Sequence, residues 1–226
     1  MPLLGSAAIL LSFDIASEAI EEHDRWHTQE HLPERLSIPG FLRGTRWTAT
    51  GSELRYMVVY EVRDLRVLTS EAYLSRLNNP TPRTQRIMPS YRGMSRGLCA
   101  VRGSFGYGQG GTAALIRFAC EEASADNVQQ WLLAEVLPKV PQTSGLGSAH
   151  LLQGAQAAAM TNEQRIRGAD RGVDSAIIIT GYDGSAVAEY AKGLCASDQL
   201  SGLGAKETSS ATYVTSYVLV SSEFDA

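Results

Sequence analysis

The stretch HDRWHTQEHLP, residues 23–33, has a second copy later in the chain. Trp131–Pro138 (WLLAEVLP) repeats the pattern Trp-x-x-x-Glu-x-Leu-Pro of Trp26–Pro33, and Trp131 lies 105 residues after Trp26. Residues four apart share one face of a helix, so both stretches read as the end of an amphipathic helix. The recurrence indicates that the chain is built from two similar halves.

Three of the four histidines lie in the first copy, and they are spaced four residues apart: His23, His27 and His31. At the offset of 105 residues the second half carries only aliphatic side chains in their places, namely Val128, Leu132 and Val136. Aliphatic residues in this pattern face a core. Because a buried imidazole without partners costs free energy, the first half is predicted to hold a pocket lined by this histidine row.

The composition excludes several classes of protein. The net charge is −4 and the chain has no Lys/Arg run, so no surface is suited to a nucleic-acid backbone. Cys99, Cys120 and Cys195 are scattered without Cys-x-x-Cys spacing, which argues against disulfides and thiolate metal sites. No apolar run approaches the roughly 18 residues of a membrane span. We expect a cytoplasmic protein that binds neither nucleic acid nor membrane.

The first hundred residues are predicted to form a strand, a helix, two strands, a helix and a strand. An apolar run predicts the first strand, and a turn at Thr50-Gly51-Ser52 predicts a hairpin between the second and third. The predicted ranges are Ala7–Ile15 for the first strand, a helix from Ser17 to Pro39-Gly40, strands over 41–50 and 54–62, a helix from Thr69, and a last strand that includes 98–101.

The second half restarts the same pattern after a glycine-rich connection at 103–111. Thr112–Cys120 aligns without gaps onto the first strand, and later segments supply a strand at 176–180, a helix at 187–194 and a strand at 213–220. The register breaks at 155–173, which is longer than a usual hairpin loop. Because residues 162–172 are nearly all polar and charged, this insertion is expected to be a mobile flap or a partner-contacting loop.

These patterns predict an α+β fold of two tandem ferredoxin-like βαββαβ repeats. One sheet face of each repeat is covered by helices, and the other is left apolar, so the two sheets can cover each other in a pseudo-dimeric α/β barrel. The expected domains are 1–106, with the candidate active site, and 107–226, with a degenerate site.

Trp26, the triplet His31-Leu32-Pro33 and the later Pro39-Gly40-Phe41 carry a family resemblance. The chain resembles the dimeric α/β-barrel superfamily, and within it the EthD-like proteins, although Trp26 lies five residues before His31 rather than the more usual four. The resemblance implies a small-molecule pocket between sheet and helices, and His31 looks like the EthD-type histidine. Members of the superfamily include cofactor-independent monooxygenases, isomerases, cyclases and haem-binding enzymes.

The predicted function is cofactor-independent acid/base chemistry on a small, mostly apolar carbonyl, aromatic or lactone-type metabolite, of isomerase, cyclase or lyase type. His31 and His27 are the candidate acid or base, since an imidazole in an apolar pocket is expected to have a pKa near working pH. Tyr56 and Tyr60 share one face of their strand, whereas Arg43 and Arg46 point to opposite faces. The residues expected to bind the substrate are His23, Trp26, Arg43, Tyr56 and Tyr60.

Several alternatives stay open at this point. The histidines could be core residues bonded to Tyr, Glu or backbone groups, or the chain could be a non-catalytic small-molecule-binding protein. His27-Thr28-Gln29-Glu30-His31 matches a short zinc-protease pattern, and imidazoles at i and i+4 can share a metal ion. A metal- or haem-dependent oxygenase is a further alternative, and a homodimer is an open possibility. His150 lies alone on a second-half strand and is expected to be structural.

Overall fold

The computed structural model describes residues 3–51, 54–155 and 160–224. Their strands form one closed antiparallel barrel in the order β1-β3-β2-β8-β5-β7-β6-β4. The strands are β1 (Ala7–Ile15), β2 (Phe41–Ala49), β3 (Tyr56–Val62), β4 (Tyr91–Gly106), β5 (Thr112–Cys120), β6 (Leu146–Gly154), β7 (Ser175–Gly181) and β8 (Ala205–Val220).

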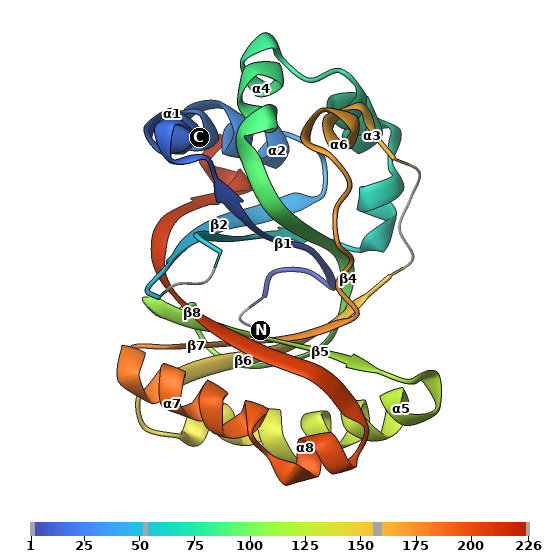
Figure 1. Ribbon diagram of the computed structural model, residues 1–226, viewed down its shortest axis with the longest axis vertical. Coiled ribbons are helices and arrows are strands. Elements are labelled where there is room, and N and C mark those ends of the chain that lie inside the picture. Colours follow the sequence, from blue (N-terminus) through green and yellow to red (C-terminus); the bar gives the residue numbers. More distant parts are fainter. Residues whose placement is uncertain (1–2, 52–53, 156–159, 225–226) are drawn as a thin grey trace.

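Helices cover the outside of the barrel in two layers that lie at opposite ends of the molecule (Figure 1). The longer helical elements are α1 (Ile20–Trp26), the π-helix η2 (His27–His31), α2 (Leu32–Leu36), α3 (Glu71–Asn78), α4 (Pro82–Ile87), α5 (Glu122–Trp131), the π-helix η5 (Leu132–Val136), α6 (Asn162–Arg167), α7 (Gly184–Cys195) and α8 (Asp198–Gly202). Short 3-10 turns are η1 (Ser17–Ala19), η3 (Leu65–Thr69), η4 (Met88–Ser90), η6 (Leu137–Gln142) and η7 (Ser221–Phe224).

The predicted α+β class and the closed barrel are confirmed. Strands of the first half are ordered β4-β1-β3-β2, those of the second half β6-β7-β5-β8, and the two sets join through the pairs β2–β8 and β4–β6. The first strand has the predicted bounds, and the predicted hairpin is formed by β2 and β3. Closure of the barrel leaves no free strand edge in this sheet.

Two strands run further than the sequence predicts. The predicted connection at 103–111 begins as strand, because β4 continues to Gly106 and pairs with β6 as far as Ser148. The last strand begins at Ala205 rather than at residue 213, since its added length pairs with β5. The extension of β4 pairs with β6, and that of β8 pairs with β5, so the need to pair backbone groups overrides the glycine-rich and polar composition.

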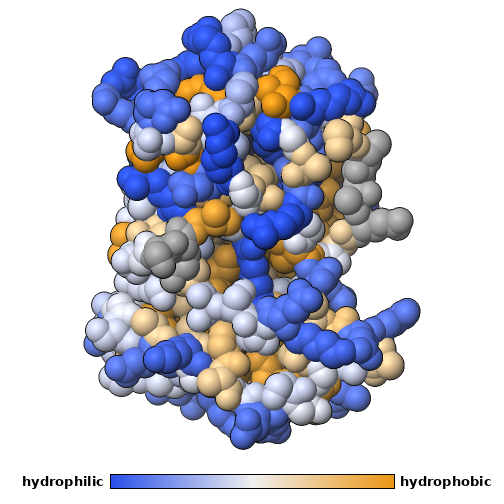
Figure 2. Space-filling view, viewed as in Figure 1, coloured by the Kyte–Doolittle hydropathy of each residue, from blue (hydrophilic) through white to orange (hydrophobic). Residues whose placement is uncertain are grey.

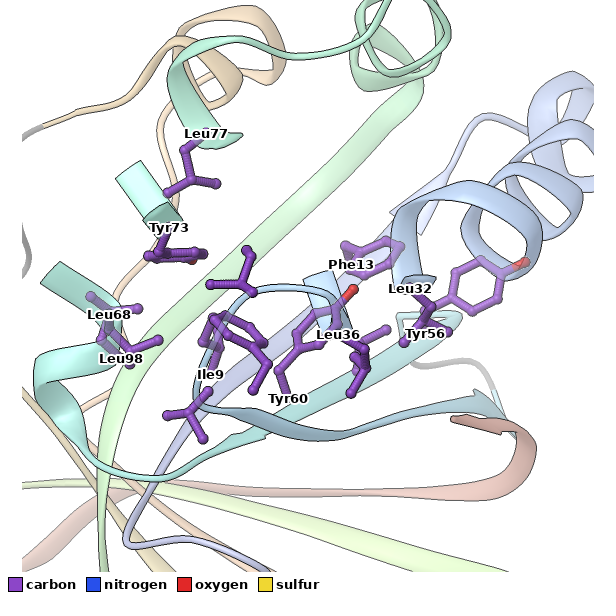
Figure 3. Packing of buried hydrophobic residues seen from close by; sticks show 14 of the residues in the cluster. Ile9, Phe13, Leu32, Leu36, Tyr56, Tyr60, Leu68, Tyr73, Leu77 and Leu98 are labelled. Atoms are coloured by element: carbon purple, nitrogen blue, oxygen red, sulfur yellow. The ribbon is translucent and has the colours of Figure 1, made fainter. Parts of the chain in front are cut away.

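The two faces of the sheet carry separate apolar cores. Along β3, Tyr56 and Tyr60 point toward the first helix layer, where they pack with Phe13 and Leu36 (Figure 3). The intervening Met57 and Val59 point into the barrel, together with residues of both halves. This alternation follows from the period of two in a strand. A third core fills the space between the sheet and α5, α7 and α8.

The insertion at 155–173 does not form the predicted flap. Residues 156–159 lie outside the described part, but Thr161, Glu163 and Val173 are buried. The helix α6 crosses to the first helix layer and contacts α3 and η4 (Figure 1). This segment of the second half is therefore packed on the first half. Its polar composition did not predict this, because charged residues can be buried when they are paired.

Within the described ranges, no helix combines the length and the apolar composition needed to cross a bilayer.

Candidate functional site

Three imidazoles form a row along the helical segment α1–η2–α2. The ring centroids of His23 and His27 lie 5.5 Å apart, and those of His27 and His31 lie 5.6 Å apart. Their exposed fractions are 0%, 2% and 7%, so the row is buried and opens slightly at His31. The predicted stripe on one helix face is confirmed.

A π turn brings Trp26 onto His31. The segment from His27 to His31 is π-helical, and the amide of Leu32 donates to the carbonyl of His27, five residues earlier. In such a turn, residues five apart become neighbours. The Trp26 and His31 rings accordingly lie 4.3 Å apart at 34°. The five-residue spacing of Trp26 and His31 is therefore the spacing of neighbours in this turn.

The second half contains the same turn at the equivalent place. Leu132–Val136 is also π-helical, at the offset of 105 residues from the first π-helix. Although π turns often mark functional sites, this one recurs where Leu132 and Val136 replace His27 and His31, so the turn itself does not depend on the imidazoles. What distinguishes the first half is therefore the imidazoles and not the turn.

Asp24 anchors the inner end of the row. Its carboxylate accepts a hydrogen bond from the Tyr56 hydroxyl at 2.7 Å and lies 3.1 Å from Nδ1 of His23. The Arg46 guanidinium donates to the Asp24 carbonyl at 3.2 Å. Burial opposes ionisation of Asp24, but the bonds from His23 and Tyr56 outweigh it, and the pKa of this carboxyl lies below its usual value. Burial and the same bond raise the pKa of Tyr56 to about 12.

Four ring nitrogens in this region are buried without a hydrogen-bond partner: His23 Nε2, Trp26 Nε1, His27 Nδ1 and His31 Nδ1. The other nitrogen of His27 lies 3.3 Å from the Tyr60 hydroxyl. A buried polar group left unpaired costs about 1 to 3 kcal/mol, and native structures hold few of them. The row and Trp26 therefore offer four unpaired ring nitrogens with which a ligand can form hydrogen bonds.

His150 provides the contrast. Its Nδ1 lies 2.9 Å from the Ser104 hydroxyl and its Nε2 lies 3.1 Å from the Ser148 hydroxyl, so both ring nitrogens are paired inside the barrel. Burial lowers the pKa of His150 to about 3, and Arg43 contributes to the shift. This fourth histidine has the structural environment that the sequence predicted for it.

The expectation that the candidate bases titrate near working pH is wrong. Burial holds the pKa values of His27 and His31 well below 6.5, and the neighbouring cationic groups lower them further. The pKa of His23 is lowered as well, although the bond to Asp24 opposes this shift. The row is therefore neutral at pH 7. Desolvation of the charged form is the dominant cause.

The row makes stability depend on pH. Unfolded histidines bind protons below about pH 6.5, whereas His27 and His31 in the folded state do not, so the free energy of unfolding falls as pH is lowered through this range. Each group contributes a slope of about 1.4 kcal/mol per pH unit. Urea denaturation between pH 8 and 5 should show a smaller slope for the double variant His27→Leu, His31→Val. Equal slopes in parent and variant would contradict the burial of neutral imidazoles.

The outer end of the row carries an ion cluster that the sequence analysis missed. His31 Nδ1 lies 3.8 Å from Oε2 of Glu34, and Arg35 Nη1 lies 3.5 Å from the same oxygen. Arg35 also forms a short ion pair with Glu163 of α6, and both side chains are buried. The repeat could have revealed Arg35, because at the offset of 105 residues it corresponds to the buried Val140. The histidines likewise correspond to aliphatic residues.

Arg43, predicted to bind the substrate, does not join the row. Its Nε donates to Glu61 at 2.6 Å, and Glu61 lies on the barrel side of β3. Arg46 takes the position beside the row instead, through its bonds to Asp24. Bulges in the pairing of β2 next to Arg43 and next to Arg46 set these orientations, which strand alternation alone could not assign.

The remaining predicted binding residues surround the histidines. Trp26 lies against all three imidazoles, Tyr56 packs on the His23 ring, and the Tyr60 hydroxyl faces His27.

Glu30 does not support the zinc-protease pattern. Its carboxylate accepts from the Thr81 hydroxyl at 2.5 Å and lies 3.7 Å from Arg83, so it is turned toward α4. Among the described residues, no three His, Cys, Asp or Glu side chains are arranged to hold a metal ion. A zincin requires a third ligand and a free glutamate as its base.

No protein-family model matches the chain, and no relative is found among curated proteins. Solved structures do match. An anthrone oxidase-like protein is similar with a TM-score of 0.66 and 12% identity, over 98% of this chain and 96% of that one. A proposed monooxygenase from Lactobacillus acidophilus NCFM has a TM-score of 0.58 and 9% identity, over 95% and 96%. A heme-binding protein from Thermus thermophilus has a TM-score of 0.52 and 10% identity, over 94% and 92%.

These neighbours share the fold of this chain over almost its whole length, so the expected α/β-barrel fold is confirmed. At such low identities the similarity concerns the fold alone.

The residues of the row do not fit a haem. The His23 ring is packed against Phe13, Tyr56 and Tyr91 at centroid distances of 5.6, 4.7 and 5.7 Å. His31 lies against the Trp26 ring. An axial ligand needs a ring nitrogen that faces an open planar space, and here aromatic side chains occupy the space beside the imidazoles.

Proposed function

We propose that the chain is a single-chain EthD-like barrel made of two tandem repeats, 1–106 and 107–226, whose first half carries one small-molecule site. The recurrence of strand, helix, two strands, helix and strand, and the π-helices at one offset, support the duplication. In this proposal the equivalent site of the second half is inactive, because aliphatic residues take the places of the histidines. Association of two copies of the chain stays a prediction.

We further propose that the first half is a cofactor-independent enzyme in which His31 is the proton carrier. The observation that carries this proposal is the set of buried, unpaired ring nitrogens at positions where the second half is aliphatic. Nδ1 of His31 would take a proton from an acidic C–H or O–H group of the substrate, which leaves an enolate or phenolate and an imidazolium. The imidazolium would return the proton at another atom to complete an isomerisation, cyclisation or elimination.

Charged side chains beside His31 would stabilise both products of the proton transfer, the imidazolium and the substrate anion. Glu34 Oε2 is buried, has no hydrogen-bond partner and lies 3.8 Å from Nδ1, where it would stabilise the imidazolium. The cationic Arg35 beside it would stabilise a developing oxyanion on the substrate. The Trp26 ring packs against His31, and the neighbouring core is apolar. This combination favours a mostly apolar aromatic or carbonyl compound with one acidic proton.

A non-catalytic binding protein is the second candidate, and the lowered pKa values favour it. A base whose pKa lies well below neutrality is weak toward carbon acids. The same neutral imidazoles would still pair with a hydroxyl or carbonyl group of a bound ligand.

Turnover and binding separate the two candidates. The parent protein would be incubated with a panel of enolisable aromatic ketones, phenols and lactones, with thermal shift reporting binding and mass spectrometry reporting products. The enzyme requires products that depend on His31, while Glu135→Gln, an exposed second-half change, leaves them unaltered. Ligands that bind without conversion would favour the binding protein. A panel that neither binds nor reacts would contradict both.

A further inference from the structure

Arg117 extends across the inside of the barrel. It lies on β5, where its neighbours of the same face, Ala113 and Leu115, belong to the interior core. Its guanidinium donates a short hydrogen bond to Ser12 of β1. In the closed order of eight strands, β1 and β5 are diametrically opposite, so this contact spans the barrel. Residues 12 and 117 are also separated by the offset of 105 residues and thus occupy equivalent places in the two halves.

Among the residues that the structure describes, this guanidinium has no anionic partner. Its Nε is buried without a hydrogen-bond partner, and no carboxylate of the described residues lies within ion-pair distance of it. Burial lowers the pKa of Arg117, and the proximity of Arg171 lowers it further. By contrast, the buried Arg35 and the largely buried Arg43 each contact a glutamate. A partly buried cation without a counter-charge is costly, which points to an anion that is supplied from outside.

Two hollows meet at Arg117. The larger has a volume of about 370 Å³, and its polar lining includes Arg171, Ser95 and Ser209. The smaller, about 170 Å³, also borders Arg117 and Ser209, and the rest of its wall is mainly apolar: Leu54, Leu115, Ala211 and Tyr213. Figure 2 shows hydrophobic and hydrophilic residues side by side at the level of the barrel. The guanidinium therefore stands where a polar space borders an apolar one.

The wall of the larger hollow is irregular at β8. The pairing of β5 with β8 shifts register between Arg117 and Ala119, and Glu207 in this bulge has a φ of 52°. A positive φ at a residue other than glycine costs free energy, and such bulges re-aim side chains beside sites. Glu207 and Asp174 are exposed carboxylates of this lining, whereas Arg117 lies further inside the barrel. A ligand that carries one anionic group meets the cation in the interior and not the carboxylates at the surface.

We propose that this end of the barrel binds a small organic carboxylate with an apolar body, its carboxylate on Arg117 and its body in the hollow lined by Leu115 and Tyr213. A guanidinium presents paired N–H groups that match the two oxygens of a carboxylate. Ser12 and Ser209 supply further hydrogen bonds to the same group. The site lies on the opposite face of the sheet from the histidine row, and it does not depend on the function proposed there.

Benzoate is the probe, with benzamide as its neutral analogue and inorganic phosphate as an anion without an apolar body. Isothermal titration of the full chain should show binding of benzoate, and at least tenfold weaker binding of benzamide and of phosphate. Arg117→Lys keeps the charge but removes the paired donors, and should weaken benzoate binding about tenfold. Arg117→Gln should abolish it. Arg102→Gln, on the exposed side of β4, is the control that should leave binding unchanged.

Some results would overturn the proposal. If the parent and the Arg117→Lys variant bound benzoate with equal affinity, Arg117 would not be the residue that binds the carboxylate. Phosphate binding as tight as that of benzoate would contradict the apolar body, and equal binding of benzamide would contradict the carboxylate. Circular dichroism of each variant checks the fold, and the lysine variant keeps the test valid if the glutamine variant fails to fold. A His31→Val protein should bind benzoate like the parent, which separates this proposal from the histidine row.

Discussion

Replacing His31 by valine is expected to lower turnover by a factor of about 10² to 10⁴, the range for loss of a general acid or base, without destabilising the fold. Nδ1 of His31 has no hydrogen-bond partner, so its removal strands no donor or acceptor at that atom. Valine also copies the equivalent Val136 of the second half. The melting temperature should stay the same or rise, as expected where a residue is kept for function.

His150→Val is the matched control for this substitution. Both of its ring nitrogens are paired, with Ser104 and Ser148. The same change leaves the Ser104 hydroxyl without this partner, while the Ser148 hydroxyl keeps its bond to Thr180, and it should cost about 1 to 3 kcal/mol. Turnover should persist at a temperature where this variant is folded. Urea denaturation and product formation measured on both variants give opposite patterns if the histidine row is the site. A His31→Val protein that is destabilised like His150→Val, with unaltered ligand binding, would show a structural histidine instead.

Replacing Glu163 by glutamine is expected to cost roughly 3 kcal/mol of unfolding free energy, at the lower end of the range for breaking a buried ion pair. The change leaves the buried Arg35 guanidinium without its closest carboxylate, and only Glu34, at 3.5 Å, remains nearby. Urea denaturation measures the loss. Hydrogen exchange of the α6 amides should increase at the same time, because the ion pair ties this helix to the first helix layer.

Two further variants test the cause of that loss. Glu135→Gln removes the carboxylate of an exposed pair with Lys139 and should change stability by less than about 1 kcal/mol. The double variant Arg35→Leu, Glu163→Leu removes both buried charges and should regain most of the stability lost in the single variant. If Glu163→Gln and Glu135→Gln were equally mild, α6 would not be held on the first half by this pair.

Local patterns predicted the strands and the histidine row well. The apolar run of β1 and the turn between β2 and β3 involve neighbouring residues only, and a spacing of four keeps imidazoles adjacent even through a π turn. The contact between Trp26 and His31 was not predictable, because α-helical spacing places residues five apart on different faces. No composition signal marks where a helix widens into a π turn.

Contacts between distant residues were the main source of error. Arg35 and Glu163 are 128 residues apart, and the polar run around Glu163 is typical of an exposed loop unless its partner is known. Similarly, alternation showed that Arg43 and Arg46 face opposite sides, but the bulges in β2 decide which side each one takes. Pairing geometry, and not residue type, determined these positions.

Because α6 belongs to the second half but packs on the first, the two halves contribute differently to the region around the histidine row. In a dimer of identical chains, any segment added to one subunit is added to both, so symmetry would place such a helix over each copy of the site. Within one chain that constraint is lifted, and the half with aliphatic residues at the equivalent positions supplies Glu163 to the half that carries the imidazoles. Two copies of residues 1–106 joined in tandem would therefore contain every strand of the barrel, yet both Arg35 side chains would lack their carboxylate. Because the halves are covalently linked, one half can supply a residue that the other half needs but does not contain.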